Sequence, residues 1–135
     1  MAYIHQRITI IQIRKPTQPT INDELQWIGT SLGLFTERDK DRSCFRIFLE
    51  LLKAAKARQL LSSDDLAEKL QLSRGTVVHH LHKLLDAGIV IAEGKKYLLR
   101  QEHLASLIDE IHKDLTRMCN DITTTAKEID EALHA

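Results

Sequence analysis

Apolar residues recur at helical spacing along most of the chain, and this pattern predicts a mainly α-helical protein. Between residues 43 and 88 it predicts three successive helices separated by short polar breaks. The first of them runs from about Ser43 to Ala57. Its apolar face consists of Phe45, Phe48, Leu51, Leu52 and Ala55.

Serines mark the expected starts of the next two helices. Ser63 is the predicted N-cap of the second, and Asp64 and Asp65 follow in its first turn, where the helix dipole favours negative charge. Ser73 is the predicted N-cap of the third, and Gly88 is its expected left-handed stop. The i, i+4, i+7 spacing predicts a buried stripe on the third helix made of Val77, Leu81 and Leu84.

Two short segments are predicted to form β structure. Residues 89–100 hold two apolar runs around a Glu93-Gly94 turn, which indicates a β-hairpin. Near the N-terminus, the β-branched, roughly alternating run Ile8–Arg14 predicts a strand. A linker with two prolines follows, and Asn22 is the predicted N-cap of a short helix after it.

Residues 102–133 are predicted to form one long helix with apolar positions in alternating steps of four and three, as in a heptad repeat. Such a seam needs a partner: either the chain's own N-terminal extension or the same helix of a second subunit, and we favour the homodimer. The predicted N-terminal strand either pairs with the partner's hairpin or covers the seam, or the linker after it contacts DNA. The predicted dimerisation residues are Leu104, Ile108, Ile111, Leu115, Met118, Ile122 and Ile129.

The chain is therefore expected to have three parts: an N-terminal extension (1–42), a central domain (43–100) and a C-terminal dimerisation helix (101–135). The formal net charge is zero but unevenly distributed. Residues 73–100 hold five basic and two acidic residues, a net charge of +3, whereas residues 101–135 hold three basic and eight acidic residues, a net charge of −5. A basic segment is favourable beside phosphates, so the central domain is the expected nucleic-acid-binding part.

The order helix, helix, turn, capped helix, hairpin resembles the winged helix-turn-helix fold. Within it, "LAEKLQLSRGTVVHHLHKLLDAGIVI" is similar to the ArsR-like transcriptional regulators of bacteria and archaea, whose pattern is S-x-x-T-V-x-x-H-L-x-x-L-x-x-A-G-(L/I)-(V/I). The resemblance covers about residues 43–100 and implies a DNA-binding domain with an added dimerisation helix. The matching residues are Ser73, Thr76, Val77, His80, Leu81, Leu84, Ala87, Gly88, Ile89 and Val90.

A recognition helix packs one stripe on the core and presents its N-terminal end to the major groove of double-stranded DNA. On the outward side, Arg74 suits a guanine or a phosphate, Thr76 and Val78 suit a thymine methyl group, and Gly75 lets the backbone approach closely. The hairpin lysines suit phosphates or the minor groove. The predicted DNA-binding residues are Arg74, Gly75, Thr76, Val78, His79, Lys83, Lys95 and Lys96.

Three histidines lie on this helix, and two more lie on the next. His79 and His82 are i, i+3 neighbours, so a metal site with His103 or His112 is geometrically conceivable. The favoured interpretation is a solvent- or DNA-facing surface, and the resemblance implies that His80 helps to hold the recognition helix. The cysteine and Asp/His elements of metal-sensing relatives are incomplete here, so no metal site and no cofactor is predicted.

Other function classes find little support in the sequence. It has no glycine-rich phosphate loop and no nucleophile beside a base, so no catalytic residue and no enzyme is predicted. It has no apolar run of about 18 residues and no signal-peptide pattern, so a cytoplasmic protein without a membrane partner is expected. The two cysteines, Cys44 and Cys119, fit no zinc spacing.

Three hypotheses follow. The first is a homodimeric, sequence-specific transcriptional regulator; the second is a winged-helix module that binds protein in a transcription or other assembly. The third is a metal- or redox-responsive repressor that uses His79, His82, Cys44 or Cys119. The sequence identifies no small-molecule effector.

Overall fold

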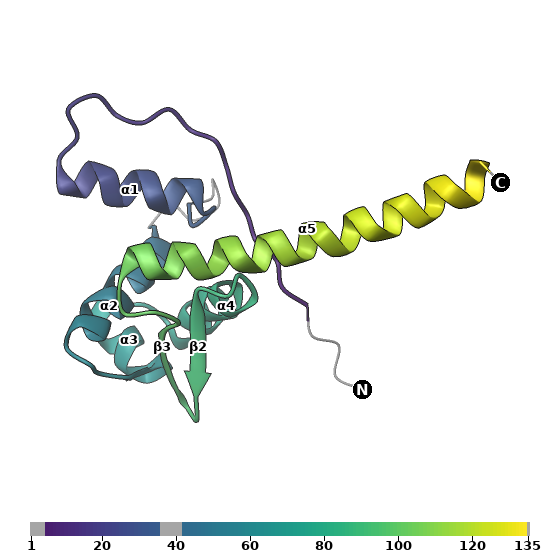
Figure 1. Cartoon of the computed structure of the whole chain (residues 1–135). Coiled ribbons are helices and arrows are strands. Elements are labelled where there is room, and N and C mark those ends of the chain that lie inside the picture. Colours follow the sequence, from purple (N-terminus) through teal and green to yellow (C-terminus); the bar gives the residue numbers. More distant parts are fainter. Residues whose placement is uncertain (1–4, 36–41, 135) are drawn as a thin grey trace.

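The computed structural model describes residues 5–35 and 42–134, which form a mainly helical protein with a small antiparallel sheet (Figure 1). The expected winged helix-turn-helix architecture is confirmed, with the long helix after it. The helices are α1 (Ile21–Ser31), α2 (Ser43–Lys56), α3 (Ser63–Leu70), α4 (Arg74–Asp86) and α5 (Leu104–His134); the strands are β1 (Leu61–Ser62), β2 (Val90–Glu93) and β3 (Lys96–Leu99).

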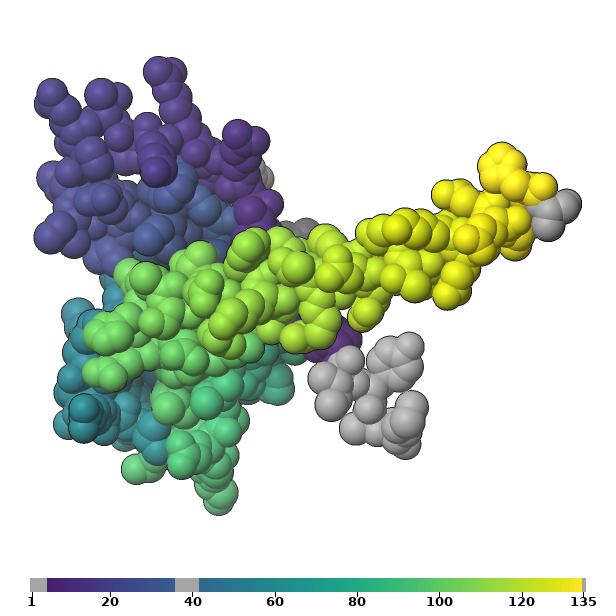
Figure 2. All heavy atoms as spheres, viewed as in Figure 1, coloured from purple at the N-terminus to yellow at the C-terminus, as the bar shows by residue number. Residues whose placement is uncertain are grey.

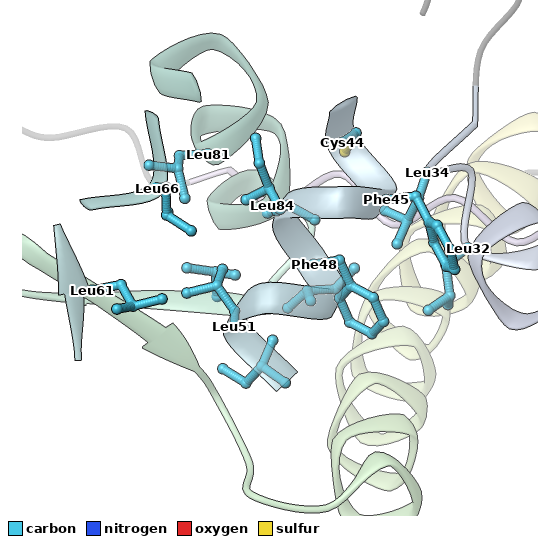
Figure 3. Close-up of a cluster of buried hydrophobic side chains, with 14 of the residues drawn as sticks. Leu32, Leu34, Cys44, Phe45, Phe48, Leu51, Leu61, Leu66, Leu81 and Leu84 are labelled. Carbon is cyan, nitrogen blue, oxygen red and sulfur yellow. The ribbon is translucent and has the colours of Figure 1, made fainter. Parts of the chain in front are cut away.

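Helix α2 is central to the core and packs against α4, α3 and β3 (Figure 3). Phe48 and Leu51 of α2 meet Leu66 of α3 and Leu84 of α4 in one fully buried cluster. Each such side chain contributes about 1.5–3 kcal/mol to folding by leaving water, so this cluster fixes the position of α4.

The sheet has the strand order β1-β3-β2, and both pairings are antiparallel. In the hairpin, Val90 pairs with Leu99 and Glu93 with Lys96, as expected for a turn at Gly94. Val90 and Leu99 are buried against the helices, which orients the hairpin as a wing. The two-residue strand β1, whose Leu61 pairs with Tyr97, was not predicted, because two residues show no measurable alternation.

Two predicted N-caps were wrong by one or two residues. The cap of α3 is Ser62, not Ser63: the Ser62 hydroxyl accepts from the amide N–H of Asp65, and the Asp65 carboxylate accepts from the amide N–H of Ser62. The cap of α1 is Thr20, not Asn22, and it forms the same reciprocal box with Asp23. In both helices, the acidic residue at the third helical position forms a capping box with the hydroxyl residue three positions before it, and this box determines where the helix begins.

The predicted strand at Ile8–Arg14 was wrong: no strand is assigned between residues 5 and 20. This segment forms hydrogen bonds with helix α1 and not with a neighbouring strand. The amide N–H of Ile11 donates to the carbonyl of Ser31 at 2.8 Å, and the indole N–H of Trp27 donates to the carbonyl of Ile13 at 3.0 Å. A β-branched run favours extended backbone, but a strand also needs a neighbouring strand.

Part of the N-terminal extension joins the main core. Leu32 and Leu34, which follow α1, belong to the same buried cluster as α2. Helix α1 approaches α2 so closely that a Cβ on Gly29 would lie 2.7 Å from Cδ1 of Phe45. The glycine therefore permits this helix contact.

Helix α5 has two halves with different surroundings (Figures 1 and 2). In the first half, Leu107, Ile111 and Asp114 are buried against the rest of the chain. The second half extends away from the domain, and its side chains are exposed. Within residues 5–35 and 42–134, no helix combines the length and apolar character needed to cross a bilayer.

Candidate nucleic-acid interface

Helices α3 and α4 form the helix-turn-helix. Helix α3 ends at Leu70, its C-cap Gln71 adopts a left-handed conformation (φ 54°), and the chain turns at once into α4. Arg46 of α2 donates to the carbonyl of Leu70 at 2.8 Å, which satisfies one of the free carbonyls at the end of α3. The turn between the two helices is therefore held by hydrogen bonds as well as by the core.

The first turn of α4 is tightly capped. The Ser73 hydroxyl accepts from the amide N–H of Thr76 at 3.1 Å and donates to the Thr76 hydroxyl at 2.8 Å. The Thr76 hydroxyl thus accepts the Ser73 hydrogen and keeps its own O–H as a donor, and its methyl group is the part that suits a thymine. The prediction of Ser73 as the N-cap is confirmed.

Gly75 lies in the exposed first turn of α4. A Cβ built at this position meets nothing within 4 Å, in contrast to the crowded Gly29. Glycine inside a helix costs about 1 kcal/mol relative to alanine, so it calls for a reason. Internal packing supplies none, and the backbone of this turn is open to solvent.

The other predicted residues of α4 lie at different depths. The packing stripe is confirmed, since Val77, Leu81 and Leu84 are buried. Among the predicted DNA-binding residues, Arg74, Gly75 and His79 are exposed on the outer side, whereas Thr76, Val78 and Lys83 are half-buried. His82 and Asp86 are exposed as well, so the outer side of α4 is accessible along its length and includes the N-terminal turn with Arg74 and Gly75.

Both wing lysines that were predicted to contact DNA are accessible to solvent. Lys95 and Lys96 are exposed at the hairpin tip, where Gly94 adopts a left-handed conformation (φ +64°) that closes the tight turn. Glycine takes this conformation without the steric cost of a Cβ. The tip therefore presents two positive charges to solvent.

Two carboxylates at the start of α3 lie close to basic side chains, Asp64 to Arg74 at the start of α4 and Asp65 to Lys96 of the wing. Asp64 Oδ1 lies 3.6 Å from Nε of Arg74, and both side chains are exposed. Hydrogen bonds from the backbone and hydroxyl of Ser62 hold the pKa of Asp65 below its usual range, and the charge of Lys96 adds to this effect. Arg74 and Lys96 thus lie on the same side of the domain, near the first turn of α3.

The histidines show no metal cluster. In the described part of the chain, no group of three His, Cys, Asp or Glu side chains is placed to hold a metal ion. His79 and His80 contact each other edge to face, with ring centroids 5.2 Å apart. His80 is half-buried and His79 and His82 are exposed. Cys44 is buried in α2, and Cys119 is exposed on α5.

The predicted dimerisation residues divide between two environments. Ile111 is already buried in its own chain, and Leu104, Leu115 and Met118 are half-buried. Ile108, Ile122 and Ile129 are exposed, at 38%, 69% and 53%. The part of the seam that is open to a second copy therefore lies mainly beyond Met118.

Sequence reasoning missed the position of the N-terminal segment, which lies beside the second half of α4. The amide N–H of Arg7 donates to the carbonyl of Asp86 at 2.8 Å. The Gln6 side-chain amide donates to the carbonyl of Ala87 at 3.3 Å and to Asp114 Oδ2 at 2.8 Å. The β-branched pattern of this segment predicts extended backbone but does not identify the helix it contacts.

Comparison with known protein families matches residues 41–91 to a helix-turn-helix domain. No curated protein and no solved structure matches the chain. The matched range covers α2, α3, α4 and the start of β2, the same elements that build the exposed surface around Arg74 and Gly75. The chain therefore contains a helix-turn-helix domain, a unit that suggests DNA binding and regulation and that is typically non-enzymatic.

Proposed function

We propose that this protein is a homodimeric, sequence-specific transcriptional regulator of the ArsR-like kind. The proposal rests above all on the exposed N-terminal turn of α4, where Arg74 and the uncrowded Gly75 offer both charge and a close backbone approach. In this arrangement the first turns of α4 enter the major groove, and the wing lysines contact the backbone or the minor groove.

Base recognition and phosphate contact fall to different residues in this proposal. Arg74 is the candidate for a guanine edge, and Thr76 and Val78 present methyl groups that suit thymine. Lys95 and Lys96 carry charge but no base-specific geometry, so they position the domain on the duplex. His79 follows Gly75 by one helical turn and extends the contact along the groove.

The exposed seam of α5 supports the homodimer. Ile122, Ile129 and Leu133 recur at i, i+7 and i+11 on a helix half that the rest of the described chain leaves exposed. Pairing with the same helix of a second copy would remove these side chains from water. Two recognition helices related by a two-fold axis would then meet half-sites about 34 Å apart.

The test is repeated selection of bound duplexes from a random DNA pool, followed by sequencing. We expect an inverted repeat with half-sites about one helical turn apart for the wild-type chain. Arg74→Gln should lose preference at one position of each half-site, whereas the matched control Lys53→Gln, on the exposed side of α2, should keep the full motif.

A salt titration distinguishes this proposal from the winged-helix module that binds protein: contacts to DNA phosphates should weaken steeply as the salt concentration rises, whereas an apolar protein interface should not. Phosphate contacts make the logarithm of the binding constant fall linearly with the logarithm of the salt concentration. In the duplex selection, the absence of an enriched sequence, together with equal binding to all duplexes or to none, would reject the sequence-specific regulator and favour the winged-helix module that binds protein.

A further inference from the structure

A groove of about 540 Å³ runs along the second half of α4, and neither the helix-turn-helix match nor the proposed DNA contacts explain it. One wall is α4, with His79, His82, Lys83 and Asp86. The opposite wall is the extended N-terminal segment, with Arg7, Thr9 and Ile11, and the loop Leu32–Phe35 lines the space between them. The volume lies in the range of sites that take drug-sized molecules.

Hydrogen bonds hold the two walls in place. At one end the amide N–H of Arg7 donates to the carbonyl of Asp86 at 2.8 Å, and at the other the amide N–H of Ile11 donates to the carbonyl of Ser31 at 2.8 Å. Between these points, the segment is in direct contact with the loop: a Cβ at Gly33 would lie only 2.7 Å from Cγ2 of Thr9. The groove is therefore formed before any ligand arrives.

The lining combines an apolar surface with positive charge. Ile11 and Phe35 supply the accessible apolar part, with the buried Leu34 behind them. Two permanent cations, Arg7 and Lys83, stand against one carboxylate, Asp86, and the two histidines add N–H donors. Within the described residues, neither Arg7 nor Lys83 has an ion-pair partner.

From this geometry we propose that the groove binds a small amphipathic anion, with an apolar body against Ile11 and Phe35 and an acidic head near Lys83 and Arg7. Such a molecule suits this lining for two reasons. Its acidic head forms a charge-assisted hydrogen bond with Arg7 or Lys83. Its apolar body leaves water for the apolar side of the groove.

Binding in the groove opposes DNA binding. His79 and Lys83 face the groove and are also candidate DNA contacts, so a bound anion occupies them and places negative charge beside the phosphates. This second statement rests on the proposed function, whereas binding of the anion does not.

The experiment uses 8-anilinonaphthalene-1-sulfonate, which fluoresces in apolar surroundings, as the probe for the full-length chain. We expect saturable binding of one probe per chain, displaced by octanoate. The uncharged N-phenyl-1-naphthylamine, which has the same rings without the sulfonate, should bind at least about tenfold more weakly. Equal affinity for the two probes would overturn the assignment of an anion.

Variants locate the site. Ile11→Ser and Lys83→Gln should each weaken probe binding about tenfold. The matched controls are Ile91→Ser, since Ile91 and Ile11 are both 42% exposed, and Lys53→Gln on α2; both should bind as the wild type does. Thermal melts of all four establish that they are folded. Equal losses in variants and controls, or no loss in either, would overturn the groove as the site.

The last arm measures the affinity for a labelled duplex with and without the probe. A several-fold loss of DNA affinity in the wild-type chain, absent in Lys83→Gln, supports the regulatory link. Probe binding with unchanged DNA affinity overturns that link. If no duplex binds even without the probe, the proposed function fails while the anion site stands on the fluorescence alone.

Discussion

Arg100, directly after the wing, holds Asp114 of α5 through both terminal nitrogens of its guanidinium group: Nη1 lies 2.5 Å from Oδ2 and Nη2 lies 3.2 Å from Oδ1. Gln6 donates to the same carboxylate from the N-terminal segment, and Arg117 donates from the next turn of α5. The carboxylate is only 5% exposed. One side chain thus joins the wing, the first half of α5 and the N-terminal segment.

Replacing this carboxylate should destabilise the fold. Asp114→Asn keeps the shape but removes the charge that Arg100, Gln6 and Arg117 share, so the free energy of unfolding at pH 7 should fall by about 2 kcal/mol. Urea unfolding followed by circular dichroism measures the change. Asp121→Asn, at an exposed position of the same helix, is the matched control and should change it by less than about 0.5 kcal/mol.

The same variant should have a characteristic pH dependence. Hydrogen bonds from Arg100, then from Gln6 and Arg117, hold the pKa of Asp114 well below its usual range, against the opposing effect of burial. A carboxyl with a lowered pKa in the folded state contributes stability above its unfolded pKa of about 4, and this contribution declines as the pH falls below that value. The stability difference between wild type and Asp114→Asn should therefore be constant above about pH 5 and narrow towards pH 3. A difference that does not vary with pH would contradict this assignment.

Gly29→Ala should loosen the contact between α1 and α2. The new methyl group would lie 2.7 Å from Cδ1 of Phe45, whose side chain is buried and has little room to move. Overpacking costs about 1–3 kcal/mol, and the helix propensity of alanine returns up to about 1 kcal/mol, so a net loss of about 1 kcal/mol is expected. A double-mutant cycle with Phe45→Leu checks the cause: the cost of Gly29→Ala should shrink in that background, and an unchanged cost would contradict the clash.

The exposed pair Arg74–Asp64 should affect DNA binding more than stability. Both side chains are largely in water, so the pair contributes little to folding. Asp64→Asn should leave the melting temperature nearly unchanged but raise the affinity for a selected duplex several-fold, because it frees Arg74 and removes a negative charge beside the phosphates. Arg74→Gln should lower the affinity. Fluorescence anisotropy at fixed salt measures both, and equal affinities for the two variants would exclude this end of α4 from the interface.

The exposed seam of α5 should determine the oligomeric state. Ile122→Glu combined with Ile129→Glu places two charges in the predicted dimer contact, so sedimentation should show a monomer where the wild-type chain is a dimer. Asn120→Glu, at an exposed position off the seam, is the control and should leave the dimer intact. A variant that stays dimeric would assign the contact to another surface.

Local patterns along the sequence were sufficient for most of the helical architecture. The spacing of Val77, Leu81 and Leu84 identified the buried stripe of α4, and Ser73 and Gly88 marked its ends, because a helix stripe and its caps depend on residues at most a few positions apart. The wing turn at Gly94 was predictable for the same reason. The caps of α1 and α3 were misplaced where two hydroxyl or amide residues compete within three positions.

Contacts between distant residues were decided by the tertiary structure. The β-branched run Ile8–Arg14 indicates extended backbone, but only the folded core determines that it is hydrogen-bonded to the end of α1 and does not join a sheet. Likewise, the heptad pattern of α5 does not distinguish Ile111, which is buried in its own chain, from Ile122, which is exposed. Periodicity reports which face of an element is apolar, whereas the identity of what covers that face depends on long-range packing, and so the groove beside α4 and the cluster around Asp114 exist only in the folded chain.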